Sequence, residues 1–325
     1  MLKNDAEKAA GVRNGRTPPG LTRGIHMNSV RSLVKSNKFL SFLFSSRFLF
    51  LFPALLLISV FVIYPLILAI VYSFTDYYLL KPNDINFVGI DNYIEMMKDK
   101  YAIKSFVNTA KYVAFIVPIQ VALSLFLAIL IAKKSKANTL FRTAFFSPYI
   151  LSIIVVALLW KNILDPEVGI INEFLTQLGF GKLGFFADPN LALPTISFII
   201  VWQGISFQML IIMAALQDVP STLYEAADIE GANAWQKFLY VTVPSIKGQL
   251  VFVLIVVTTN IFKIIVEPLV LTNGGPQGST SSILLYMFEQ GTRYRQIGYA
   301  SAITVIFAIL LIIIAFVQKR LVKED

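Results

Sequence analysis

Polar side chains interrupt the long apolar runs of the chain, and their types suit the recognition of a polar, ring-shaped solute. Near the middle of one run lie two aromatic and two amide side chains, those of Trp202, Gln203, Phe207 and Gln208. Aromatic faces stack on the C–H face of a sugar ring, and amides can both donate to and accept from its hydroxyl groups. Because polar groups deep in an apolar helix are costly, these residues are candidates for a solute pathway.

A second apolar run carries charged side chains as well. Asn260, Lys263 and Glu267 follow one another at spacings of three and four residues. On one continuous helix they would share a face, which must point to a cavity or a neighbouring helix and not to lipid. We expect Lys263 to favour an acidic saccharide, such as a uronate or alginate oligomer, because an uncharged sugar needs no cation.

Other interpretations of these polar residues stay open. Lys263 and Glu267 could neutralise each other one helical turn apart, and glutamine side chains often serve only to join neighbouring helices. The same two charges could instead relay a proton or ion in an ion-coupled secondary transporter that works without ATP. An intramembrane enzyme is disfavoured because the sequence offers no credible catalytic pair.

Several other chemistries lack their usual residues. The chain has no cysteine, and its single histidine, His26, lies in a polar N-terminal segment, so no thiolate or metal site is predicted. A phosphate-binding loop needs the pattern G-x-x-x-x-G-K-[ST]. In "GFGKLGF" the lysine is followed by Leu183, and "GGPQGST" has no lysine, so both stretches are interpreted as turns. The chain is therefore not expected to hold a cofactor or to be an enzyme.

Composition indicates which elements position these side chains. Of the 325 residues, 56% are hydrophobic and only 14% are charged, and the mean hydropathy is +0.70. A soluble domain carries about 25% charged residues, whereas runs of roughly 20 apolar residues are what a helix needs to cross a membrane. We predict an all-α polytopic membrane protein with six transmembrane helices, at residues 48–74, 109–132, 141–160, 191–216, 250–271 and 297–317.

The basic residues predict an orientation in the membrane. The net charge of +9 is concentrated in the N-terminal segment and in loops that lie on the inner side if both termini are cytoplasmic. This distribution favours a membrane protein with both termini on the cytoplasmic side and gives no indication of nucleic-acid binding. We expect residues 1–30 to form a disordered cytoplasmic tail, and residues 31–47 an amphipathic segment that lies along the lipid headgroups.

The loop at residues 217–247, between the fourth and fifth predicted spans, is much longer than a turn requires. In its stretch "YEAADIEGANAWQKFLYVTVP", Glu225 pairs with the preceding Thr222 in the pattern of a helical capping box, and Gly231 is a typical helix stop. The face of this helix is built from the small residues Ala226, Ala227, Gly231 and Ala232. Small residues let another protein's backbone approach closely, and Glu225 can accept a charge-assisted hydrogen bond from a partner.

A second short helix is predicted in the same loop. Asn233 and Gln236 repeat the capping pattern, and Pro244 should end this helix before the next span. The two helices would form a compact helix, bend, helix unit. On these patterns alone, the unit could equally pack only on its own spans.

The stretch "EAADIEGA", followed by Pro244, resembles the signature of the permease subunits of binding-protein-dependent ABC importers. Val241 and Val243 stand where that signature usually has Ile and Leu, which are conservative departures. The resemblance extends from about residue 50 to residue 321, through "FVGIDNYIEMM", "FRTAFFSPYILS", "ALLWKNILDPEVGIIN", "LTNGGPQGST" and "GYASAITVIFAIL" in order. These segments are similar to those of carbohydrate-uptake permeases of the maltose-type or multiple-sugar family.

The resemblance implies a type I permease domain at residues 48–321 that lies in a bacterial inner membrane and imports sugars by alternating access. It implies that a coupling helix docks in a cleft of a separate ATPase subunit through Glu225, Ala226, Ala227, Asp228, Gly231 and Ala232, and that Pro244 fixes the turn into the fifth span. It implies as partners a second, homologous permease, two ATPase subunits that bind ATP and Mg, and an extracytoplasmic solute-binding protein. The "GGPQGST" turn could border the surface on which that binding protein docks.

Overall fold

The computed structural model describes residues 46–132 and 135–322. Within these ranges the regular structure is helical, and the strand-like pairing consists of isolated bridges between Thr75 and Phe87 and between Tyr78 and Gln296. The all-α prediction is therefore confirmed for the described residues. The expected tail at 1–30 and almost all of the amphipathic segment at 31–47 lie outside them.

The chain divides into two compact units, Met1–Pro65 and Leu66–Asp325. The described part of the first unit contains α3 (Ser46–Ile58) and the π-helical turn η1 (Ser59–Ile63), after which α4 (Tyr64–Tyr72) begins. These segments run on without interruption, and Phe50–Tyr72 is long and apolar enough to cross a membrane. The first predicted span is thus present as a helix.

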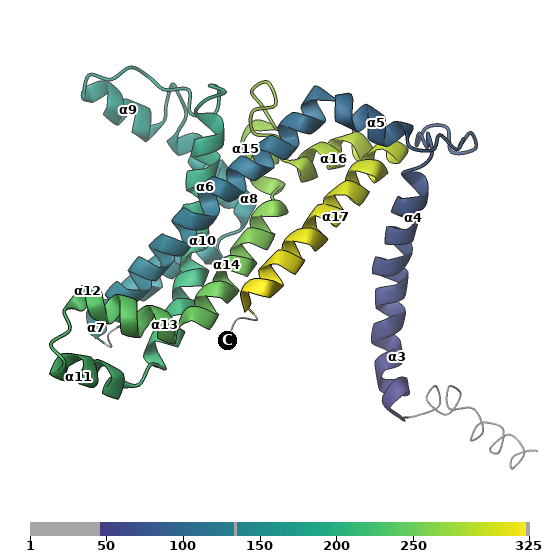
Figure 1. Cartoon of the computed structure of the whole chain (residues 1–325). Coiled ribbons are helices and arrows are strands. Elements are labelled where there is room, and N and C mark those ends of the chain that lie inside the picture. The colour runs from purple at the N-terminus through teal and green to yellow at the C-terminus, as the bar shows by residue number, and fades with distance from the viewer. Residues whose placement is uncertain (1–45, 133–134, 323–325) are drawn as a thin grey trace, which may run out of the picture. The chain divides into compact units, whose positions relative to one another are not determined.

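The second unit holds the other helices (Figure 1). They are α5 (Asp91–Lys98), α6 (Lys100–Ile131), α7 (Lys136–Ile150), α8 (Ile153–Ile163), α9 (Ile170–Gln177), α10 (Ala192–Gln217), α11 (Ser221–Ile229), α12 (Ala234–Lys237), η2 (Phe238–Thr242), α13 (Val243–Ser245), α14 (Lys247–Phe262), α15 (Val266–Thr272), α16 (Ile283–Thr292) and α17 (Ile297–Val322).

The main apolar core lies where α6, α10 and α14 pack together. Tyr112 and Ile116 of α6, Ile199 and Met209 of α10, and Val253 of α14 are all essentially inaccessible and belong to one cluster. A polar contact adds to this packing, because the hydroxyl group of Ser124 on α6 donates to the carbonyl oxygen of Ile205 on α10 at 3.2 Å. The second and fourth predicted spans therefore form the centre of the unit.

Among the described residues, four helices are long and apolar enough to cross a membrane, and the number rises to six if two bent helix pairs each count as one span. The predicted continuous helix at 141–160 is wrong. α7 and α8 meet at an angle of 99°, because Leu151 and Ser152 adopt extended backbone conformations. The carbonyl oxygen of Leu151 cannot be satisfied inside a helix there, and it accepts instead from Nε2 of Gln203 at 3.2 Å.

The predicted continuous helix at 250–271 is also wrong. α14 ends at Phe262, and α15 begins only at Val266. Pro268 explains the break, since it has no N–H to donate to the carbonyl oxygen of Ile264 four residues earlier. That oxygen accepts from the hydroxyl group of Ser282 at 2.6 Å. A second bend, of 71°, separates the Ala234–Ser245 segment from α14.

Candidate functional site

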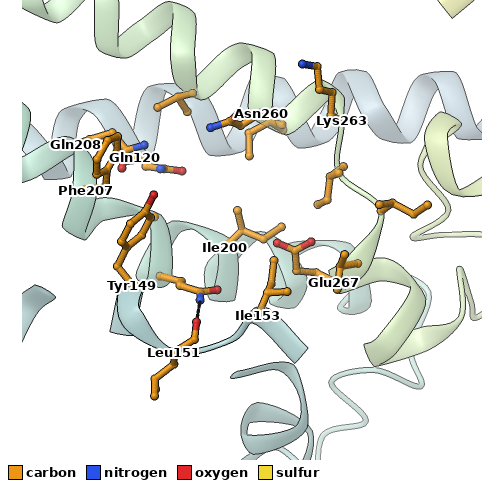
Figure 2. Close-up of a pocket in the computed structure, with 17 residues that line it drawn as sticks. Gln120, Tyr149, Leu151, Ile153, Ile200, Phe207, Gln208, Asn260, Lys263 and Glu267 are labelled. Carbon is orange, nitrogen blue, oxygen red and sulfur yellow. Dashed lines mark hydrogen bonds between the residues drawn. The ribbon is translucent and has the colours of Figure 1, made fainter. Parts of the chain in front are cut away.

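A cavity of about 440 Å³ lies among α6, α7, α8, α10, α14 and α15 (Figure 2). Both helix breaks open onto it, because Leu151 and residues 263–265 are among its lining residues. Backbone that leaves the helical conformation at membrane depth is tolerated where it lines such a cavity. The two breaks therefore help to form the cavity.

Most of the predicted pathway residues line this cavity, and one does not. The lining includes Gln203, Phe207, Gln208, Asn260, Lys263 and Glu267. Trp202 lies outside it, with its ring edge-on to that of Trp160 at a centroid distance of 5.4 Å. Gln203 also lines the cavity, but its Nε2 donates to the carbonyl oxygen of Leu151, at the break in the third span. Gln203 therefore joins two neighbouring helices, which was the other interpretation of the glutamine side chains.

Two further amides give the cavity unused hydrogen-bonding capacity. Gln120 of α6 and Gln208 of α10 are 3% and 4% exposed. The Oε1 atom of each is buried and has no hydrogen-bond partner among the described residues. Because an unsatisfied buried acceptor is costly, such a pair is suited to receive hydroxyl or amide donors from a bound solute.

An aromatic pair stands at the same end of the cavity. The rings of Tyr149 on α7 and Phe207 on α10 are stacked, with centroids 5.1 Å apart and planes 11° from parallel. Sequence reasoning missed Tyr149 and Gln120. Each lies in a different predicted span from Phe207, and no local spacing indicates that these spans meet there.

The predicted shared face of Asn260, Lys263 and Glu267 is wrong because the helix ends between them. Lys263 is the C-terminal cap of α14, and Glu267 lies on α15. Figure 2 shows the carboxylate of Glu267 turned into the cavity and the Lys263 side chain leading away from it. Within the described ranges, neither residue takes part in an ion pair.

The second candidate site is the pair formed by α11 and the segment α12–η2. α11 begins at Ser221 after Pro220, and no side chain of the described residues caps its first turn, so the predicted capping box of Thr222 and Glu225 is wrong. The predicted stop at Gly231 is confirmed. Gly231 has φ +78°, its N–H donates to Asp228 O, and the N–H of Ala232 donates to Ala227 O. This is a Schellman ending, which favours glycine because of the positive φ.

The predicted cap of the second helix is confirmed. Oδ1 of Asn233 accepts from the Gln236 N–H at 3.0 Å, and Oε1 of Gln236 accepts from the Asn233 N–H at 2.8 Å. Pro244 does not end this helix directly. It lies inside α13, which is reached through the π turn η2 and ends at Ser245.

A groove separates the two helices of this pair, and the predicted small residues lie along it. Its lining consists of Leu223, Ala226, Ala227, Glu230, Gly231, Ala232, Gln236, Lys237, Tyr240 and Val241. An ion pair between Asp228 and Lys237 and a 3.0 Å hydrogen bond between the hydroxyl groups of Tyr224 and Thr242 hold the helices together. Asp228 therefore has a partner in its own chain, while Glu225 is exposed.

Large apolar side chains of this pair are exposed as well. Ile229, at the end of α11, is 88% exposed, and Tyr240 of η2 is 76% exposed. Exposed apolar side chains on a helix pair whose groove is lined by small residues are typical of a protein-binding surface.

Residues 120–324 match the family described as binding-protein-dependent transport system inner membrane component. The chain belongs to this family. The match includes the cavity and the α11–α12 groove, so both sites lie in the part of the chain that carries the family's features.

Named relatives support the assignment of this permease. It is 33% identical to a probable ABC transporter permease protein of Pyrococcus horikoshii, over 82% of this chain and 91% of the relative. It is 32% identical to the diacetylchitobiose uptake system permease protein of Streptomyces coelicolor, over 84% and 81%.

A solved structure shares the fold of the permease. A chain of a bacterial ABC transporter involved in the import of the acidic polysaccharide alginate matches with a TM-score of 0.75 at 20% identity. The match covers 91% of this chain and 98% of that one. The predicted type I importer permease fold is thereby confirmed.

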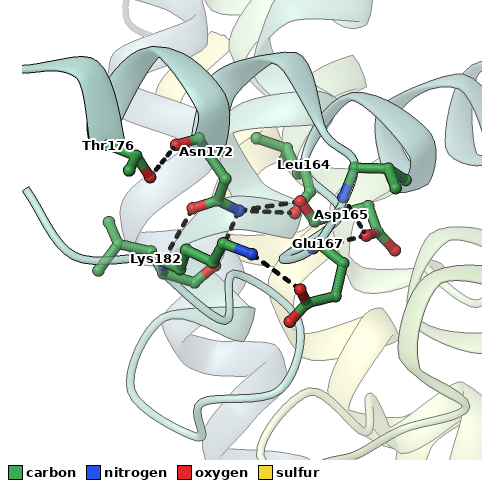
Figure 3. A network of polar contacts seen from close by, with 8 residues as sticks. Leu164, Asp165, Glu167, Asn172, Thr176 and Lys182 are labelled. Atoms are coloured by element: carbon green, nitrogen blue, oxygen red, sulfur yellow. Dashed lines mark hydrogen bonds and ion pairs between the residues drawn. The ribbon is translucent and has the colours of Figure 1, made fainter.

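The permease also has a folded connection between α8 and α10, built around Asn172 (Figure 3). Asn172 is 1% exposed. Its Nδ2 donates to the carbonyl oxygens of Asp165 at 3.0 Å and Leu183 at 3.1 Å, and its Oδ1 accepts from the Leu183 N–H at 2.8 Å. An exposed ion pair of 2.7 Å joins Lys182 to Glu167. One buried amide thus organises a connection in which sequence analysis predicted only a turn.

Proposed function

We propose that this chain is a transmembrane permease subunit of an ATP-driven importer for sugars or oligosaccharides. The observation that carries the proposal is the cavity, in which stacked aromatic rings and buried amide oxygens that lack a partner in the described part of the chain surround a space between broken helices. Rings and amides together are what a saccharide needs for recognition. The uptake of diacetylchitobiose and the import of alginate, named for two similar proteins, agree with this class of substrate.

The α11–α12 pair would couple this permease to a separate ATPase subunit on the cytoplasmic side, where both termini would also lie. An exposed Glu225 and a groove lined by Ala226, Ala227 and Gly231 support this role, because they let a partner's backbone approach and offer it an acceptor. ATP and Mg would be held by two such subunits. A second, homologous permease would complete the pathway, and an extracytoplasmic binding protein would deliver the sugar.

Transport would follow alternating access. When ATP closes the ATPase subunits, the coupling helices would move together and turn the cavity outward to receive sugar. Hydrolysis and reopening would expose the cavity to the cytoplasm. The Asp228–Lys237 ion pair and the Tyr224–Thr242 hydrogen bond connect α11 to the segment that leads into α14. These contacts would transmit the movement of the coupling helix to α14.

Reconstitution of the permease with its partners in vesicles tests this function. We expect uptake of labelled oligosaccharide that requires both ATP and the binding protein. Glu225→Lys and Gly231→Asp should each release the ATPase during purification and abolish uptake. Uptake by the chain alone, driven by an ion gradient without ATP, would refute the proposal in favour of a secondary transporter.

A further inference from the structure

We propose that Glu267 makes this cavity selective for neutral or cationic saccharides, amino sugars included, and against acidic ones. The inference rests on the proposed function, because it names the substrate class of the same pathway. It reverses the expectation drawn from Lys263.

The charges around the cavity carry this inference. Among the described lining residues, Lys263 and Glu267 are the charged ones, and the others are apolar, aromatic or amide side chains. Lys263 is exposed, and its side chain leads away from Glu267, whereas the Glu267 carboxylate turns inward (Figure 2). A solute in the cavity therefore meets an anion that no cation of the described chain neutralises.

The chemistry of a carboxylate decides which sugars such a cavity accepts. An ionised carboxylate only accepts hydrogen bonds, so it can bind two sugar hydroxyl groups or one ammonium group. The carboxylate of a uronate has no proton to offer and carries the same charge. Two like charges a few ångströms apart repel strongly where protein replaces water. The uncharged amides Gln120, Gln208 and Asn260 do not reverse this preference.

The break at Pro268 gives Glu267 its position. On the continuous helix expected from the sequence, Lys263 would lie one turn from Glu267 and could neutralise it. The end of α14 at Phe262 and the restart at Val266 separate the two side chains instead. The polarity of the cavity thus depends on a helix break, and the residue types alone do not reveal it.

Charged thiol reagents measure this polarity without knowledge of the natural sugar. The chain has no cysteine, so Asn260→Cys places a single reactive thiol in the cavity wall of the assembled importer. We would compare its reaction rates with cationic trimethylammonium-ethyl and anionic sulfonato-ethyl methanethiosulfonate at neutral pH. Intact mass of this chain alone gives the rates, each normalised to a small free thiol. We expect the cation to react about tenfold faster than the anion.

Matched variants identify the source of the preference. Glu267→Gln should reduce the cation-to-anion rate ratio to near one, while Glu267→Asp should keep it. Lys263→Gln removes a cation about one turn from the thiol, so it should leave the ratio at or above its wild-type value. Glu289→Gln on α16, outside the cavity, should leave the ratio within about twofold, because a distant charge is screened. A faster anion, or a ratio that responds to Lys263→Gln and not to Glu267→Gln, would overturn the assignment.

Transport gives an independent measurement if Glu267→Gln fails to assemble. The wild-type importer should take up a neutral oligosaccharide in preference to its uronate counterpart of the same linkage, and uptake of the uronate alone would also overturn the assignment. If the cationic reagent still reacts faster but no ATP-dependent sugar uptake is found, the proposed function is refuted, while the inference about the polarity of the cavity is supported. If ATP-dependent sugar uptake is found but the cationic reagent reacts no faster than the anionic one, only the proposed role of Glu267 is refuted.

Discussion

The side chain of Gln120 occupies the space in which a β-carbon on Gly204 would stand. A Cβ built on Gly204 of α10 would lie 2.3 Å from Nε2 of Gln120 on α6, far inside van der Waals contact. Gly204 is therefore required for the Gln120 amide to reach the cavity at the place where it lies.

We predict that Gly204→Ala displaces Gln120 and impairs transport. Overpacking at a helix contact costs about 1–3 kcal/mol, and the displaced amide would lose its place beside the bound solute. Sugar uptake should fall several-fold while the permease still assembles with its partners. Gly248→Ala is the matched control, because open space surrounds Gly248 in α14. That change should stabilise the helix by up to about 1 kcal/mol and leave uptake intact. Equal effects of the two substitutions would contradict this role of Gly204.

Ile229 should contribute to binding of the ATPase. Its side chain is 88% exposed at the end of α11, and burying such a side chain in a partner's cleft is worth roughly 1.5–3 kcal/mol. Ile229→Asp should therefore weaken ATPase association at least about tenfold, as measured by binding of the purified subunits. Val168→Asp, at a residue 81% exposed between α8 and α9, is the control and should bind normally. Normal binding by both variants would exclude Ile229 from the contact.

Asn172 should be essential for the α8–α10 connection. Removing its amide leaves the partly buried carbonyl oxygen and N–H of Leu183 without their partner, each at a cost of up to about 1–3 kcal/mol. We expect Asn172→Ala to make residues 164–183 sensitive to limited proteolysis under conditions in which the wild type resists. Gln177→Ala, which removes only an exposed hydrogen bond to Glu173, should remain resistant. An unchanged cleavage pattern for Asn172→Ala would argue against this organising role.

Asp99 should make stability depend on pH in the acidic range. Burial alone would raise the pKa of Asp99, but hydrogen bonds from the hydroxyl groups of Tyr286 and Tyr299 and from the Tyr101 N–H hold that pKa below its ordinary value. Because the folded pKa is the lower one, the carboxylate stabilises the protein above the ordinary pKa of about 3.9. This stabilisation is lost as the pH falls through the folded value.

The Tm of Asp99→Asn tests this prediction. The wild type should melt at a higher temperature than the variant, by a constant margin above about pH 5, and the margin should narrow below about pH 4. Asn keeps the side-chain cap of α6, so the comparison isolates the charge. A margin that grows on acidification would mean that the folded pKa is raised.

Local signals predicted part of the α11–α12 pair correctly. The cap of Asn233 with Gln236 and the stop at Gly231 depend on groups within a few residues of one another, so their spacing is informative. The same pattern at Thr222 and Glu225 was misleading, because α11 begins at Ser221 with Pro220 as its N-terminal cap, two residues earlier than a cap at Thr222 allows. Pro268 was a local signal of the break in the fifth span that a count of apolar residues overlooks.

The sequence by itself determined that this chain is an α-helical membrane protein, where its apolar segments lie and where the loop with the α11–α12 pair lies, since hydrophobicity and capping depend on residue type and spacing. Only the tertiary structure decided how the third and fifth spans break and which side chains face one cavity. The breaks leave the carbonyl oxygens of Leu151 and Ile264 to be satisfied by Gln203 and Ser282 from distant segments. Residue spacing along one helix cannot reveal such contacts, because they form only when the helices pack.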